Sequence, residues 1–262
     1  MYTVISPAKK LNFEKLNRKI KITNSNFKPE TNKLVKTVKK LSSRELQSLM
    51  KISTSLADLN YERFKSFRTT NSNNEKQAIL AFAGDVYSGL DATTLTNNEL
   101  EFSQKHIGIL SGLYGLLRPL DGIQPYRLEM GSKLSIDSSS NLYNYWEDKL
   151  TNSIINMVSN TKSNSLVNLA SNEYFSAIQT KGFPAPIIQP IFKETVNGQN
   201  KIISFVAKKS RGLMARYIIK NKINDPKHLK EFDIDNYKFR PKLSDETRWV
   251  FTRTHSKKIT NK

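Results

Sequence analysis

The sequence contains no cysteine and only three histidines. The absence of cysteine excludes disulfide bridges, thiolate zinc sites, iron–sulfur clusters and cysteine nucleophiles. His106, His228 and His255 are far apart in the chain, so a histidine metal site would need all three together or several added carboxylates. We therefore expect neither a metal ion nor a cofactor.

Long apolar runs are also absent. No segment approaches the ~20 apolar residues of a membrane-spanning helix, and the first ten residues lack the apolar core of a signal peptide. We expect a cytoplasmic protein with no membrane contact, and no protein partner is predicted. The 262 residues, 37% of them hydrophobic and 10% aromatic, are enough to form a buried core.

Positive charge is abundant and unevenly distributed. The chain has 42 basic and 23 acidic side chains, a formal charge of +19. Residues 1–40 hold 11 basic and 2 acidic side chains, and residues 201–230 hold 9 and 1, whereas residues 101–200 are neutral. A lysine-rich, AT-biased genome would explain the total but would spread lysine evenly. The segregation therefore indicates a local positive field that attracts polyanions.

Apolar periodicity predicts a mixed α/β protein. We expect a single domain over residues 1–256, with a central mixed sheet flanked by helices and a frayed basic tail at 257–262. Polar loop tips are expected at 71–75 and 138–141. A capping box, Ser42 followed by Glu45, predicts a new helix start within the helical stretch 30–68. Strands are expected at residues 2–6, 78–83, 107–117, 166–170 and 202–206, and further helices at 141–157 and 208–222.

The helix expected at 208–222 combines a buried arc with a broad cationic face. Six basic side chains fall on two adjacent lines of the helical wheel, and few acidic residues accompany them. An ordinary solvated helix face is the alternative, and the scarcity of acidic partners argues against it. The basic residues are Lys208, Lys209, Arg211, Arg216, Lys220 and Lys222.

Residues 49–57 have the spacing of a helix-hairpin-helix element. In such an element the hairpin amides face a phosphate. Met50, Lys51 and Ser53 stand where that motif has Pro-Gly and a second Gly, so Lys51 would have to supply the phosphate contact. An ordinary helical hairpin is an equally good interpretation of this segment.

The segment 112–131 concentrates functional groups without helical or strand periodicity. With Asp85 and Glu173 it would form a polar pocket at strand ends, in which Arg118 and Arg127 hold an anionic group. The alternative is structural: the two arginines neutralise Asp121 and Glu129.

Five separated motifs together resemble the YaaA family of bacterial peroxide-stress proteins. They are Ser6-Pro-Ala-Lys9, Gly84-Asp-Val-Tyr-Ser-Gly-Leu90, residues 113–131, Asn168-Leu-Ala-Ser-Asn-Glu-Tyr174 and Lys208-Lys-Ser-Arg-Gly-Leu-Met-Ala-Arg216. The resemblance runs from residue 1 to about 253. It implies a family-specific α/β fold, with a helix-hairpin-helix-like element at about 44–60 and a basic cleft that binds DNA. It also implies a role in limiting oxidative DNA damage and intracellular iron under peroxide.

From the residues and the resemblance together we predict a DNA-binding protein of the peroxide stress response, with double-stranded DNA as its partner. The expected phosphate contacts are Lys9, Lys10, Lys51, Lys208, Lys209, Arg211 and Arg216. The alternative function is an enzyme acting on nucleic acid or a nucleotide, with Asp85, Arg118, Arg127 and Glu173 as its site. A third interpretation is a lysine-rich housekeeping fold whose charge is incidental.

Overall fold

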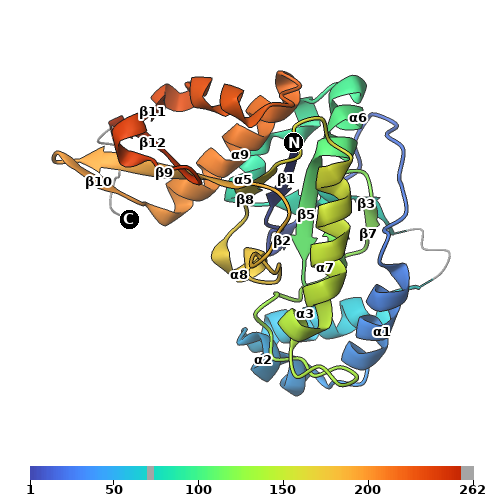
Figure 1. Cartoon of the computed structure of the whole chain (residues 1–262). Coiled ribbons are helices and arrows are strands. Elements are labelled where there is room, and N and C mark those ends of the chain that lie inside the picture. The colour runs from blue at the N-terminus through green and yellow to red at the C-terminus, as the bar shows by residue number, and fades with distance from the viewer. Residues whose placement is uncertain (70–73, 255–262) are drawn as a thin grey trace.

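A computed structural model describes residues 1–69 and 74–254, and it shows a mixed α/β architecture (Figure 1). His255, the expected tail at 257–262 and part of the loop expected at 71–75 lie outside these residues. The described helices are α1 (Lys28–Val38), α2 (Ser43–Met50), α3 (Thr54–Ser66), α4 (Ala78–Ala81), α5 (Asp85–Leu90), α6 (Asn97–His106), α7 (Leu142–Ser159), α8 (Asn172–Phe175) and α9 (Ser204–Lys220).

The central sheet is mixed, as the sequence predicts. Its strand order is β11-β12-β9-β8-β1-β5-β6, with β10 paired to β9. The pairs along the path from β12 to β5 are parallel, and the pairs made by β6, β10 and β11 are antiparallel. The strands are β1 (Tyr2–Ile5), β5 (Ile107–Ser111), β6 (Gly115–Leu117), β8 (Leu166–Leu169), β9 (Ile187–Val196), β10 (Gln199–Lys201), β11 (Lys238–Phe239) and β12 (Arg248–Thr254).

Two small ribbons stand beside the central sheet. β2 (Lys10–Leu11) pairs with β4 (Phe82–Ala83), and β3 (Lys76–Gln77) pairs with β7 (Gly122–Ile123). The first ribbon holds the segment that follows β1 next to the segment that precedes α5. It thereby fixes the basic residues at the end of β1 against the rest of the fold.

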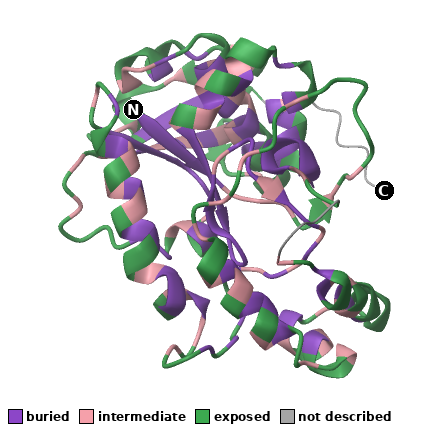
Figure 2. Ribbon diagram, turned by 90° about the vertical axis from the view of Figure 1, so that its right-hand side faces the viewer, coloured by how far each residue is buried: buried purple, intermediate pink, exposed green. Residues whose placement is uncertain are grey.

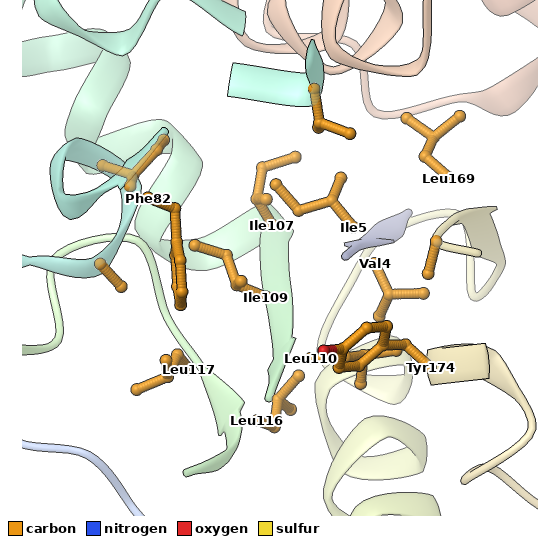
Figure 3. Packing of buried hydrophobic residues seen from close by; sticks show 14 of the residues in the cluster. Val4, Ile5, Phe82, Ile107, Ile109, Leu110, Leu116, Leu117, Leu169 and Tyr174 are labelled. Carbon is orange, nitrogen blue, oxygen red and sulfur yellow. The ribbon is translucent and has the colours of Figure 1, made fainter. Parts of the chain in front are cut away.

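The core lies around β1 and its two neighbours. Every residue of β1, β5 and β8 is buried, which is expected for parallel strands covered on both faces (Figure 2). Ile5 is in register with Ile109 of β5 and Leu169 at the end of β8, while Val4 lies on the side of Tyr174 (Figure 3). The sheet therefore supplies a rigid frame for the loops at its ends.

Local sequence signals predicted several elements correctly. The Ser42–Glu45 capping box is present at the start of α2. Asn141 caps α7, accepting a hydrogen bond from the backbone N–H of Asn144. In α7 the Trp146 indole donates to the carbonyl oxygen of Gly112 at 2.9 Å, which anchors this helix to the segment after β5.

Three expected strands are wrong in detail. Residues 78–83 form the single turn of α4 and the short strand β4, because Ala78 and Ile79 donate their N–H groups to the 119–121 loop. Residues 107–117 form the two antiparallel strands β5 and β6, joined by a turn at residues 112–114. Residues 202–206 contain no strand: α9 begins at Ser204, and the strands in this region are β9 and β10, which the sequence analysis missed.

Helices α5 and α9 cross in direct backbone contact. A Cβ atom at Gly89 would overlap the carbonyl oxygen of Lys209, and one at Gly212 would overlap that of Val86. Arg216 reinforces the crossing by donating to the carbonyl oxygens of Leu90 at 2.9 Å and Asp91 at 2.8 Å. The position of the basic helix α9 is therefore fixed by α5.

Candidate functional site

The carboxyl ends of β1 and β8 form a topological switch point. β1 and β8 are parallel neighbours in the sheet. From β1 the chain continues within this sheet to β5, which lies on one side of this pair, and from β8 it continues to β9, which lies on the other side. The two outgoing connections therefore diverge and leave a crevice between the strand ends. Open α/β sheets bind their ligands in this position.

Two serines join the strand ends at this crevice. The Ser6 hydroxyl donates to Ser171 Oγ at 3.2 Å, and the Ser171 backbone N–H donates to Ser6 Oγ at 2.8 Å. The Tyr87 hydroxyl of α5 donates to the Ser6 carbonyl oxygen at 3.0 Å. Three of the sequence motifs therefore meet at this point.

A small pocket of about 10 Å³, room for about one water molecule, lies beside the loop that follows Ser6. The Arg127 Nε donates to Glu129 Oε1 at 2.9 Å, and Lys9 Nζ lies 3.6 Å from the same oxygen. Within the described part of the chain, no donor reaches Glu129 Oε2, although this oxygen is buried. The pocket is lined by Pro7, Ala8, Lys9, Tyr126, Arg127, Leu128, Glu129 and Tyr174.

The two tyrosines of the pocket are neutral hydrogen-bonding groups. Burial raises the pKa of both Tyr126 and Tyr174. The hydroxyl groups of Tyr126 and Ser111 are 2.6 Å apart. These phenols can line a binding site, but they cannot serve as bases near neutral pH.

Glu173 lies at the rim of this region. Its Oε1 accepts a hydrogen bond from the Gly131 N–H at 3.3 Å, and its carbonyl oxygen accepts one from the Tyr143 hydroxyl at 2.9 Å. Asp85 lies instead in a wider groove with Lys10, Ser88 and Asp91. The four acidic and basic residues predicted to share one pocket are thus distributed over several places.

Arg118 is engaged in a structural ion pair. Its Nη2 lies 2.9 Å from Asp121 Oδ1, its backbone N–H donates to Oδ2 at 2.8 Å, and its Nη2 also donates to the Asn24 carbonyl oxygen. Asp121 is fully buried and accepts a further bond from Thr23 Oγ1 at 2.6 Å. Arg118 thus neutralises Asp121, and Arg127 likewise forms an ion pair with Glu129, as the structural alternative expects. The Arg127–Glu129 pair differs in that both residues line a pocket.

The predicted phosphate-binding cations differ in their availability. Lys9 pairs with Glu129, and Arg216 is bound to carbonyl oxygens of α5 and its C-cap. Lys10, Lys208 and Lys209 are exposed and form no ion pair with any described residue. These three remain available to a polyanion.

Arg211 differs from the exposed lysines because its side chain is half-buried. Burial lowers the pKa of this guanidinium, although arginine stays charged under all ordinary conditions. No acceptor within residues 1–69 and 74–254 binds it. It is an unpaired positive charge on the same helix as Lys208 and Lys209.

Lys51 lies in the connection between α2 and α3. It joins α2 to α3 in the left-handed conformation with φ of 51°, and Ser53 caps α3 through the Leu56 N–H. Helices α2 and α3 are therefore joined by a short connection, while their assignment as a DNA-binding helix-hairpin-helix element stays a prediction. In Figure 1 this hairpin lies at the lower end of the molecule, remote from the β9–β10 ribbon and the start of α9.

Ser6, Ser171 and the unpaired oxygen of Glu129 were not predicted as site features. Ser6 ends one predicted strand and Ser171 directly follows another, which was an available signal. Their proximity depends on β1 and β8 being neighbours, and the sequence does not encode strand order in any local pattern.

Two further properties concern metals and membranes. Over residues 1–69 and 74–254, no three side chains of histidine, aspartate or glutamate are grouped to hold a metal ion. Among the same residues, no helix is both long and apolar enough to span a bilayer.

Comparison with known proteins places these motifs in a family. A family model described as peroxide stress protein YaaA matches residues 1–243. A UPF0246 protein of Idiomarina loihiensis is 48% identical over 258 residues, 98% of this chain and 100% of the relative. Those of Saccharophagus degradans and Hahella chejuensis are 46% and 44% identical, each over 97% of this chain and 99% and 100% of the relative. Because the family model matches residues 1–243 and these relatives match 97–98% of the chain, this chain belongs to the YaaA family of peroxide stress proteins.

Proposed function

We propose that this protein binds double-stranded DNA and limits its oxidative damage during peroxide stress. The observation that carries the proposal is the position of the two basic segments on either side of α5. Ala8 lies next to Gly84 at the start of α5, and the Lys209 backbone lies against Gly89 near its end. Six helical residues extend only about 9 Å, so residues separated by about 200 positions border one short helix.

We define the proposed binding surface as Lys10, Lys208 and Lys209, the lysines beside α5 that form no ion pair with described residues, and these lysines give it its affinity for phosphate. Lys10, Lys208 and Lys209 are flexible point charges, which attract a phosphate backbone without reading its sequence. Arg211 adds a half-buried charge on the same helix. Binding should consequently be steeply salt-dependent and nearly independent of DNA sequence.

A double variant of α9 tests this proposal. Lys208→Ala with Lys209→Ala should weaken duplex binding and make the slope of log K against log salt less negative by about 2, since each phosphate contact contributes about 0.9. Lys162→Ala with Lys181→Ala removes the same charge from exposed positions in the neutral middle of the chain and serves as the control. Equal salt slopes for wild type and the α9 variant would refute the proposed surface.

The physiological part of the proposal has its own test. Cells that lack this protein should regain survival and intact DNA under peroxide when they receive the wild-type gene. The α9 double variant, expressed at the same level, should restore neither. Full protection by this variant would separate peroxide resistance from DNA binding.

A second candidate function follows from the unpaired oxygen of Glu129. A buried carboxylate oxygen without a donor is costly, and a ligand N–H would satisfy it. Lys9, at the mouth of the same pocket, suits the anionic group of such a ligand. For an enzyme acting on a nucleotide, predicted above at Asp85, Arg118, Arg127 and Glu173, this second candidate uses Lys9, Arg127 and Glu129, which line one pocket.

Calorimetric titration with the common nucleoside monophosphates tests this second candidate. Saturable binding that Glu129→Gln weakens at least tenfold, with the fold intact, would support it. Absence of binding to the wild-type protein at millimolar concentrations would reject a nucleotide ligand for this pocket.

A further inference from the structure

The first turn of α9 exposes an aromatic ring among lysines. Phe205 is 56% exposed and the preceding Ile202 is 60% exposed. Most large apolar side chains of the described chain are buried, and Phe205 is the one exposed phenylalanine among the described large hydrophobics. Lysines 208 and 209, which the proposed function assigns to phosphate binding, follow within the next turn.

Helix geometry places these side chains on one face. Positions three and four residues apart are neighbours on a helix surface, so Lys208 and Lys209 both lie beside Phe205. Gly212, the next position along this face, packs against α5. The free part of the face is therefore limited to a single aromatic ring and two adjacent cations.

We propose that Phe205 stacks on an unpaired base while Lys208 and Lys209 hold the neighbouring phosphates. This inference rests on the proposed DNA binding and adds a base contact to it. Aromatic side chains within a cationic surface bind single strands because every base offers a flat face, and the contact requires no particular sequence. Duplex regions with locally unpaired bases would present the same face.

The surroundings of Phe205 favour nucleic acid over a lipid surface. An interfacial helix exposes an apolar stripe along its length. In α9 the apolar residues Met214, Ala215 and Ile218 are fully buried in the core instead. The adjacent strand β10 presents the polar, exposed sequence Gln199–Lys201. The exposed large apolar side chains of this described segment are only Ile202 and Phe205, too few to insert into a membrane, and the Phe205 ring can stack on a single base.

Substitution of Phe205 tests the proposal with a fluorescent single-stranded oligonucleotide and a fully paired duplex. Phe205→Ala should weaken single-strand binding by at least about fivefold, which is the lower end of the loss in affinity when one stacking aromatic side chain is replaced by alanine. The salt slope should stay unchanged, because no phosphate contact is lost. Phe205→Trp should retain wild-type affinity. Leu243→Ala removes another exposed apolar side chain, 47% exposed, and serves as the control.

The outcomes separate failure of the stacking contact from failure of the proposed DNA binding. If the folded wild-type protein binds neither oligonucleotide, the proposed function fails. If it binds both and Phe205→Ala binds the single strand as well as wild type does, the stacking contact is wrong and phosphate binding stands. If Phe205→Ala loses only binding to vesicles of anionic phospholipid, the residue is a membrane contact, which also overturns the proposal.

Discussion

Gly212 of α9 lies directly against the carbonyl oxygen of Val86 on α5, with no room for a Cβ atom between them. This contact holds the basic helix α9 against α5. We predict that Gly212→Ala lowers the free energy of unfolding by about 1–3 kcal/mol, the usual effect of overpacking. Denaturant titration measures the change.

A matched glycine provides the control for that prediction. A Cβ at Gly131 would meet Glu173 Oε1 at 3.4 Å, an ordinary contact distance. Gly131→Ala should therefore stay within about 0.5 kcal/mol of wild type, as most surface substitutions do. Equal destabilisation by both variants would contradict the close crossing of α5 and α9.

Arg118 is predicted to act through stability. Arg118→Ala leaves the buried carboxylate of Asp121 without its guanidinium, and loss of one partner of a buried pair costs about 3–5 kcal/mol. Asp121→Asn in the same chain removes the uncompensated charge and should recover part of that loss. An Arg118→Ala variant as stable as wild type would show that Arg118 is free to bind a ligand.

Lys51 occupies a backbone conformation that favours glycine. Its φ of 51° is left-handed, and a residue with a Cβ pays about 1 kcal/mol there. We expect Lys51→Gly to be more stable than Lys51→Ala by about 0.5–1 kcal/mol, because alanine keeps the strain. Thermal unfolding of the two variants measures this difference, and greater stability of the alanine variant would contradict it.

The amino terminus should make stability depend on pH. Burial lowers the pKa of the Met1 amine from 8.0 to about 6, and the amine donates to the Asn224 carbonyl oxygen at 3.1 Å. Between these pKa values the unfolded chain binds more protons than the folded one, so stability should rise from pH 6 to pH 8, by about 1–2 kcal/mol.

His106 contributes in the same direction at lower pH. Burial lowers the pKa of its imidazole, whose Nδ1 lies 3.0 Å from the Met1 carbonyl oxygen. Denaturation of the protein with an acetylated amino terminus isolates the amine, because that variant should lose the rise between pH 6 and pH 8. An unchanged rise after acetylation would assign the effect to other groups.

Local signals predicted the elements whose stabilising contacts are close in sequence. The Ser42–Glu45 box satisfies helix N–H groups within three residues and was confirmed, and the helix predicted at 141–157 is present as α7, with Asn141 as its cap. The run at 202–206 was assigned wrongly, because β-branched residues favour a strand only when a neighbouring strand pairs with them. Here the neighbouring strand β10 ends at Lys201, and the chain turns into α9.

The sequence by itself determined the mixed α/β class, the segregation of positive charge, the basic helix and the family. These properties follow from composition, from periodicity and from motifs that are contiguous in the chain. Only the tertiary structure decided that Ser6 meets Ser171, that Arg118 pairs with Asp121, and that α9 crosses α5 in backbone contact. The physical reason is that strand order and helix crossings arise from packing between distant segments, and each such contact depends on both partners at once.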